Sequence, residues 1–355
     1  MHWMKRGLSV ASLLLGACLI VVDPIIARLF LPFREMIGVL LSVQLVVCFL
    51  IFWRHRQGGR SLIWPFAIAA VTLVFGMAVL PAEYRTREET VAFTSKDTRL
   101  VGTLYHSKAE GEHPALVIVH GSGKFPRRLY RYWGQTFAAL GFDVLVYDKR
   151  GVGDSGGQYE GENNTSPNNL DVLAEDASNA VTFIASQPGV TRHIGLFGVS
   201  QGGWIAPMAA ARNARVKFLI LHSGPVVSVR EQNYFAKLTG EGHDSPKEPI
   251  TDAEAHLRAI RPGGFDPRPV LADLNATALW LFGDADSSVP VGESVTHLQP
   301  LITSGKAFEY RLFHGDHLIL TRSTRFSGLN EQYWNTIVDW MMRHKGRDLE
   351  EHAKL

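Results

Sequence analysis

A short apolar run that turns at a glycine-serine-glycine pattern and continues with helical spacing is the feature that most constrains this fold. The run covers residues 194–210, IGLFGVSQGGWIAPMAA, and its turn contains Gly198, Ser200 and Gly202. A serine hydroxyl is a poor nucleophile at its free pKa, so enzymes hold it on a sharp strand-to-helix turn beside a base and oxyanion donors. The pattern therefore predicts a strand, a turn that presents Ser200 as a nucleophile, and a helix.

A second copy of the pattern, residues 153–157 (GDSGG), offers Ser155 as a competing nucleophile and matches the sequence around the nucleophile of trypsin-like proteases. Ser155 follows the polar residues 148–153 and leads into residues 158–169, whose Gly, Asn and Glu content is typical of a loop. A trypsin-like chain also needs an upstream histidine and aspartate on an all-β fold, whereas the β-like runs here alternate with helical patterns. Ser200 is therefore the favoured nucleophile.

The alternation of β-like and helical segments predicts the fold class. After an opening pair at residues 90–94 and 99–106, short apolar runs typical of buried parallel strands occupy residues 115–119, 143–147, 194–197, 218–222, 278–282 and 309–313. Helical spacing occurs at residues 131–140, 170–186, 200–212 and 331–345. The pattern predicts an α/β fold with a mostly parallel, doubly wound sheet.

In such a sheet, functional groups collect on the loops past the carboxyl ends of the strands. Residues 120–123 (HGSG) follow the first central strand, and their backbone amides could face an oxyanion beside the amide of Gln201. Residues 283–290 offer two carboxylates, of which Asp286 is favoured, and residues 314–317 offer two histidines, with His317 favoured and His314 as the alternative. Residues 147–153 are interpreted as a structural turn that flanks the site.

Residues 91–345 resemble the α/β-hydrolases, and specifically their bacterial esterase and serine-peptidase-like branch. The resemblance rests on four blocks: HGSG at 120–123, YDKRGVGDS at 147–155, GVSQGG at 198–203 and IAP at 205–207. It implies Ser200 as nucleophile, Asp286 as acid and His317 as base, with the backbone amides of Ser122 and Gln201 as the oxyanion hole.

Two departures from the family pattern are Val199, where a histidine or another polar residue often precedes the serine, and Asp316, where a small residue is more usual. A carboxylate at position 316 could compete for the imidazole of His317 or raise its pKa.

The implied activity is a serine hydrolase that cleaves carboxylic esters through an acyl-enzyme and needs neither a cofactor nor a metal ion. Thioesters and amides pass through similar intermediates, so the substrate stays open; small to medium acyl esters, including lipid-like ones, are preferred. A serine acyltransferase and a membrane-tethered, non-catalytic binding protein are the alternatives. The long excursion over residues 225–273 is expected to form a lid.

Composition separates residues 1–81 from residues 82–355. The first segment contains three apolar stretches, residues 8–30, 36–53 and 61–80, each near the roughly 20 residues that cross a bilayer core. The second segment carries 29 basic and 32 acidic residues, and this balance argues against a nucleic-acid partner. Both cysteines, Cys18 and Cys48, lie in the apolar stretches, so the second segment has no disulfide framework.

The apolar segment is expected to be a transmembrane anchor of about three helices in contact with membrane lipids. A lipoprotein signal peptide ending at Cys18 is the alternative, but the chain stays apolar beyond that residue. Basic residues at positions 5–6 and 54–60 would lie on the cytoplasmic side. Three spans would then place the catalytic domain outside the cytoplasm, in the periplasm if the membrane is a bacterial inner membrane.

Overall fold

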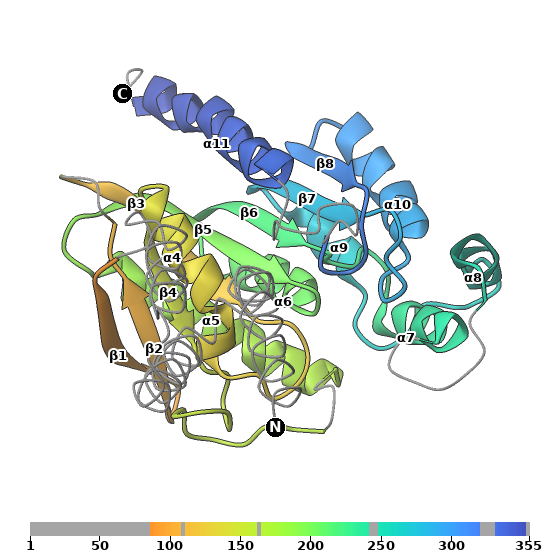
Figure 1. Cartoon of the computed structure of the whole chain (residues 1–355), viewed down its shortest axis with the longest axis horizontal. Helices are drawn as coiled ribbons and strands as arrows, with labels where there is room; N and C mark the ends of the chain where they lie inside the picture. The colour runs from red at the N-terminus through yellow and green to blue at the C-terminus, as the bar shows by residue number, and fades with distance from the viewer. Residues whose placement is uncertain (1–85, 108–110, 162–164, 241–247, 320–330, 353–355) are drawn as a thin grey trace, which may run out of the picture. The chain divides into compact units, whose positions relative to one another are not determined.

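The computed structural model describes residues 86–107, 111–161, 165–240, 248–319 and 331–352, all within one compact unit (Figure 1). The strands are β1 (Glu88–Ser95), β2 (Thr98–Tyr105), β3 (His113–Val119), β4 (Asp143–Tyr147), β5 (Val190–Val199), β6 (Val216–His222), β7 (Thr277–Gly283) and β8 (Phe308–Phe313). The helices are η3 (Arg127–Tyr130), α4 (Arg131–Ala139), α5 (Pro167–Ala185), α6 (Gly202–Arg212), α7 (Val229–Thr239), α8 (Ile250–Leu257), α9 (Pro267–Asp273), α10 (Val291–Thr303) and α11 (Glu331–His352).

The eight strands form one sheet in the order β1-β2-β4-β3-β5-β6-β7-β8. The β1–β2 and β2–β4 pairs are antiparallel, and every pair from β4–β3 to β7–β8 is parallel. The predicted, mostly parallel α/β sheet is confirmed. Because β3 to β8 run in one direction, the loops after β3, β5, β6, β7 and β8 emerge at the same edge of the sheet.

Helices cover both faces of the sheet, as a doubly wound fold requires. On one face the side chains of α5, α6 and α10 pack on alternate strand residues such as Val117 and Leu196. On the other face α4 and α11 pack on the intervening residues, such as Ile118 and Phe197. Both faces of the central strands are therefore buried, which explains why these strands are almost continuously apolar.

The start of α5 was predicted three residues too late, because its capping signal lies in polar sequence. Ser166 is the N-cap residue and its Oγ accepts a hydrogen bond from Asn169 N at 3.3 Å, while Pro167 occupies the first helical position. A serine N-cap followed by proline supplies both the missing acceptor and a pre-set φ angle. These residues extend the helix beyond its apolar repeat.

The excursion between β6 and β7 contains α7, α8 and α9, and Figure 1 shows α7 and α8 away from the strands. Residues 241–247 of this excursion lie outside the described residues. Phe235 of α7 is fully buried and packs with Ala253 and Leu257 of α8. Phe235 therefore belongs to the core of the α7–α8 pair, and the lid expected over residues 225–273 stays a prediction.

The three expected membrane spans lie outside the described residues. Among the helices that the structure does describe, none is long and apolar enough to cross a bilayer.

Candidate functional site

Ser200 occupies a strained turn between β5 and α6. Its φ angle is +50°, a left-handed conformation that costs a non-glycine residue about 1–3 kcal/mol unless the surroundings enforce it. The surroundings do so here: Ser200 N donates to His222 O at 2.9 Å, and Ser200 O accepts from Gly203 N at 2.7 Å. The strand-turn-helix prediction is confirmed, with the helix beginning at Gly202 rather than at Ser200.

The glycines around Ser200 are required because backbone atoms approach them closely. A Cβ added to Gly198 would lie 2.5 Å from Gly202 O, and one added to Gly202 would lie 2.4 Å from Val119 O. Both distances are far below van der Waals contact with rigid backbone. The glycine-serine-glycine spacing thus lets α6 start directly against β3 and β5.

The predicted acid and base meet at the ends of β7 and β8. Asp286 Oδ2 lies 2.8 Å from His317 Nδ1. Asp286 Oδ1 accepts hydrogen bonds from Ser288 N at 2.7 Å and Val289 N at 2.9 Å. The aspartate side chain is fully buried, whereas 22 % of the His317 side chain is exposed. A buried carboxylate that fixes one ring nitrogen of a partly exposed histidine is the arrangement that a general base needs.

The backbone connects Ser200 to His317 through the end of β6. His222 O accepts the Ser200 N–H, and the next residue, Ser223, donates from its Oγ to His317 O at 2.7 Å. His222 is buried, and its Nδ1 lies 2.9 Å from Tyr333 OH. Burial and then the charge of His317 lower the pKa of His222 to about 3. His222 is therefore neutral at physiological pH and adds no positive charge beside the base.

The loop after β3 lies against the nucleophile. A Cβ added to Gly121 would lie 3.5 Å from the Cβ of Ser200, so Ser122 follows a residue in contact with the turn. Gly121 N donates to Tyr130 OH at 2.9 Å, so this amide already has an acceptor within the protein and is not a candidate oxyanion donor. Gln201 is buried and occupies the N-cap position of α6, at a helix end where backbone N–H groups favour negative charge. Ser122 and Gln201 thus remain the candidate oxyanion donors.

Ser155, the competing serine, has a structural role. Its Oγ donates to Asp148 O at 2.7 Å and accepts from Val101 N at 2.9 Å. Asp148 is buried, pairs with the Arg127 guanidinium, and accepts from Asp154 N at 3.1 Å. The turn after β4 is therefore held together by its own polar groups, as the sequence interpretation of residues 147–153 predicted.

The alternative histidine forms a second, exposed pair. His314 Nδ1 lies 3.1 Å from Asp284 Oδ2, but 86 % of the His314 side chain and 46 % of the Asp284 side chain are exposed. Asp316, the unusual neighbour of His317, accepts a hydrogen bond from Leu318 N at 3.0 Å. The Nδ1 atom of His317 faces Asp286, so the assignment of His317 with Asp286 is the better supported of the two.

Two residues of this region were not predicted as functional. His222 is the last residue of a strand whose sequence is mainly apolar, and Lys149 lies in a turn rich in polar residues. Lys149 is 3 % exposed, and its Nζ donates to Gly121 O at 2.7 Å. Lys149 lies two residues past the end of β4, and a lysine in such a turn is usually solvated, so the sequence carried no signal of its burial.

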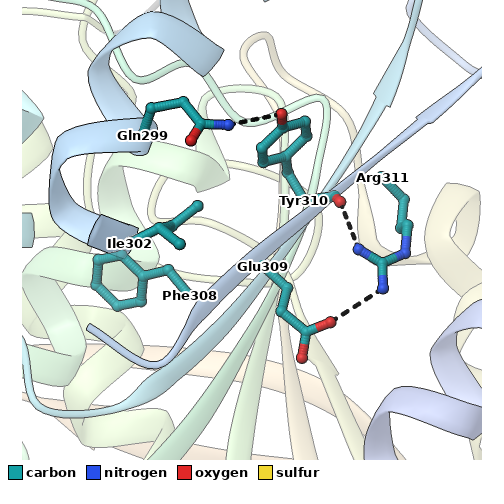
Figure 2. A pocket seen from close by; sticks show the side chains of 6 residues that line it. All are labelled: Gln299, Ile302, Phe308, Glu309, Tyr310 and Arg311. Atoms are coloured by element: carbon teal, nitrogen blue, oxygen red, sulfur yellow. Dashed lines mark hydrogen bonds and ion pairs between the residues drawn. The ribbon is translucent and has the colours of Figure 1, made fainter. Parts of the chain in front are cut away.

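A hollow also lies beside the edge strand β8, and Figure 2 shows the side chains that line it: Gln299, Ile302, Phe308, Glu309, Tyr310 and Arg311. Its polar groups bond to one another, since Gln299 Nε2 donates to Tyr310 OH at 2.8 Å and Arg311 Nη2 donates to Glu309 Oε2 at 3.1 Å. None of the predicted site residues lines it. The candidate active site is therefore the group of loops around Ser200.

Comparison with known proteins agrees with this fold. The family described as serine aminopeptidase, S33 matches residues 111–245. The esterase Pf2001 of Pyrococcus furiosus superposes with a TM-score of 0.55 at 16% identity, over 74% of this chain and 92% of that one. The described residues have the α/β-hydrolase fold, and that prediction is confirmed.

Two curated relatives are fungal proteins. The thiohydrolase aneE of Aspergillus aculeatus is 31% identical over 193 residues, which are 54% of this chain and 56% of that protein. The polyketide transferase claH of Penicillium crustosum is 33% identical over 127 residues, which are 36% of this chain and 39% of that protein. The matched segments thus span about half of each relative or less.

Proposed function

We propose that this α/β-hydrolase-fold protein is a serine hydrolase that cleaves carboxylic esters or thioesters through an acyl-enzyme. The observation that carries the proposal is the hydrogen-bonded pair of Asp286 and His317, placed at the same sheet edge as the strained turn of Ser200. The family match to a group of serine peptidases and the fold shared with an esterase support it.

In the proposed mechanism His317 removes the proton of Ser200 Oγ as that oxygen attacks the substrate carbonyl. The carboxylate of Asp286 keeps the proton on Nδ1, so Nε2 is the basic atom, and stabilises the imidazolium that forms. The tetrahedral oxyanion accepts hydrogen bonds from the amides of Ser122 and Gln201. His317 then protonates the leaving group, and water attacks the acyl-enzyme with the same residue as base.

Apolar side chains at the site favour an acyl substrate over a peptide. Phe125, in the same loop as Ser122, and Leu318, directly after His317, are 50% and 54% exposed. Apolar side chains exposed beside catalytic groups are typical of a binding surface for an apolar ligand. The name of one relative, a thiohydrolase, supports adding thioesters to this class.

The experiment that tests the proposal is intact-mass spectrometry of the protein, mixed with a p-nitrophenyl ester and quenched in acid. We expect a mass increase equal to the acyl group less the hydrogen that it replaces, absent in Ser200→Ala and unchanged in His314→Ala. The Ser155→Ala variant should still acylate. A folded wild-type protein that gains no mass with esters or thioesters contradicts the proposal and favours the non-catalytic alternative.

Acyl transfer is the second candidate, because one curated relative is named as a transferase. Transfer and hydrolysis share the acyl-enzyme and differ only in the acceptor. Adding an alcohol to the acylated protein distinguishes them: faster loss of the acyl mass with formation of the new ester indicates transfer, and a rate set by water alone indicates hydrolysis.

We propose in addition that residues 1–81 anchor this domain in a bacterial inner membrane with the catalytic domain in the periplasm. The support is the apolar sequence and the basic residues at its predicted cytoplasmic ends. The protein should stay with the membrane after extraction at alkaline pH, and a reporter fused to its C-terminus should be active only outside the cytoplasm. Release into the supernatant contradicts the anchor.

A further inference from the structure

A buried lysine contacts the loop that carries the candidate oxyanion donor. Lys149 lies two residues past the end of β4, is 3 % exposed, and donates from Nζ to Gly121 O at 2.7 Å. Among the described residues no carboxylate forms an ion pair with this ammonium. Its neighbour Asp148 is committed to Arg127. The ammonium therefore donates to one carbonyl oxygen and lies 5.2 Å from the centre of the Tyr159 ring.

Placing a lysine there is costly, which argues for a role beyond packing. Burial disfavours the charged form and lowers the pKa of Lys149 to about 7. An apolar side chain of similar length would fill the same space without this desolvation cost. Strongly perturbed ionisable groups without a structural ion pair are typical of functional sites.

The carbonyl that Lys149 contacts belongs to the peptide bond that also carries the candidate oxyanion donor. Gly121 O and Ser122 N are the two polar ends of the peptide bond between these residues, and Ser122 N is the candidate oxyanion donor. On the other side, Gly121 N is held by Tyr130 OH at 2.9 Å. The loop is thus fixed at two consecutive peptide groups, in contact with the turn of Ser200.

We propose that Lys149 is a positioning residue that orients and polarises the Gly121–Ser122 peptide, which makes Ser122 N a stronger donor to the oxyanion. A charged donor on a carbonyl oxygen draws electron density from the attached nitrogen, and linked hydrogen bonds strengthen one another. Lys149 neither gives up nor takes up a proton during the reaction, and it touches no substrate atom. The inference rests on the proposed function, since it assigns a role within the serine hydrolase mechanism.

The charge of Lys149 should produce an alkaline limb in the pH profile of kcat. His120 of the loop after β3 lies close enough for the charge of Lys149 to lower its pKa, and the centre of the Tyr159 ring, in the loop after β4, lies 5.2 Å from Nζ. Tyr130 of η3 holds the loop that Lys149 contacts through Gly121 N. His120 is neutral because burial lowers its pKa to about 3. As the pH rises through the pKa of Lys149, the ammonium is lost and the polarisation with it.

The test compares the full-length wild type with Lys149→Met, Lys149→Arg and the exposed control Lys124→Met, which lies beside the same tyrosine ring. We expect Lys149→Met to lower kcat about 10- to 100-fold with KM nearly unchanged, less than the roughly 10²–10³-fold cost of deleting a whole oxyanion donor. Lys149→Arg keeps its charge at high pH, so it should recover activity and lose the alkaline limb. Lys124→Met should match the wild type.

A spectroscopic readout separates this role from a structural one. A trifluoromethyl ketone with a ¹³C-labelled carbonyl forms a hemiketal with an active serine, and the ¹³C shift reports the pKa of the hemiketal hydroxyl. The hemiketal pKa should be higher in Lys149→Met than in the wild type, and in Lys149→Arg it should return to the wild-type value. If Lys149→Met does not fold, the loss of the alkaline limb in Lys149→Arg carries the test.

The outcomes keep the two proposals apart. If the wild type forms the hemiketal but kcat, the pH profile and the hemiketal pKa are unchanged in both Lys149 variants, the role of Lys149 is overturned. The proposed function then stands. A folded wild type that forms neither a hemiketal nor an acyl-enzyme overturns the proposed function and this inference with it.

Discussion

Asp286 and His317 are 31 residues apart in the sequence, yet the carboxylate Oδ2 of one lies 2.8 Å from the imidazole Nδ1 of the other. The second carboxylate oxygen is held by two backbone N–H groups, so the aspartate cannot turn away from the ring. An ionised carboxylate only accepts hydrogen bonds, and therefore the proton of the neutral histidine lies on Nδ1. This fixed tautomer leaves Nε2 as the basic nitrogen.

Replacing the carboxylate of Asp286 by an amide should remove most of the activity. In Asp286→Asn the side chain can donate to Nδ1, which favours the wrong tautomer, and we expect kcat to fall about 10³- to 10⁴-fold, the scale known for triads of this kind. The measurement is ester hydrolysis at saturating substrate, with folding checked by circular dichroism.

The exposed pair of Asp284 and His314 provides the matched control for this prediction. Both side chains are in contact with solvent, and such a pair contributes about 0–1 kcal/mol. Asp284→Asn and His314→Ala should retain kcat within a few-fold. Equal losses in Asp284→Asn and Asp286→Asn would show that the two aspartates were assigned to the wrong histidines.

Adding a methyl group to Gly202 should displace the nucleophile. The new Cβ would lie 2.4 Å from Val119 O, so α6 or β3 must shift, at a cost of roughly 1–3 kcal/mol or more. We expect Gly202→Ala to lower both the thermal midpoint and kcat. Gly156→Ala is the control, because its Cβ would lie 3.4 Å from Arg99 O, an ordinary contact. An active, stable Gly202→Ala enzyme would refute the close-packing argument.

Ser155 should affect stability but not chemistry. Ser155→Ala leaves Val101 N and Asp148 O without the partner that they share, and an unsatisfied buried group costs about 1–3 kcal/mol. Urea unfolding should give a lower midpoint, while kcat per folded molecule stays at the wild-type value. A loss of kcat with unchanged stability would reopen Ser155 as a catalytic residue.

Two buried histidines should make the protein less stable in acid. Burial lowers the pKa of His120 and of His222 to about 3, whereas both residues titrate near 6.5 in the unfolded chain. Between these values the unfolded state binds more protons, so the free energy of unfolding falls as the pH falls from about 6.5 to about 3, by up to about 1.4 kcal/mol per pH unit for each histidine.

The variant His120→Phe tests that linkage, because phenylalanine keeps the ring that stacks on Tyr130 and removes the titration. Urea unfolding measured between pH 4 and pH 7 should show a shallower dependence on pH than in the wild type. An unchanged slope would mean that the pKa of His120 is the same in the folded and unfolded states, and would contradict the prediction.

Local sequence signals were sufficient for the strands and for the triad candidates. The bounds of β4 were predicted without error, and the other central strands extend beyond the predicted ranges by one to four residues at an end, such as His113 in β3. Asp286 and His317 were predicted to lie at one edge because parallel strands bring their carboxyl ends together, and the two side chains do lie 2.8 Å apart. Their catalytic roles with Ser200 stay a prediction.

Contacts between distant segments could not be predicted in the same way. Lys149 and Gly121 are 28 residues apart, and nothing in the turn sequence indicates that the lysine is buried rather than solvated. The α10 helix was missed as well, because Pro300 lies inside it and its start has no side-chain cap. These features depend on tertiary packing, which overrides local propensity.

The most direct measurement of the central claim is labelling of the detergent-solubilised protein with a fluorophosphonate, which reacts only with an activated serine, followed by peptide mapping of the adduct. The account predicts an adduct on Ser200 in the wild type and in Ser155→Ala, and none in Ser200→Ala. An adduct on Ser155, or a folded wild-type protein that stays unlabelled, would contradict it.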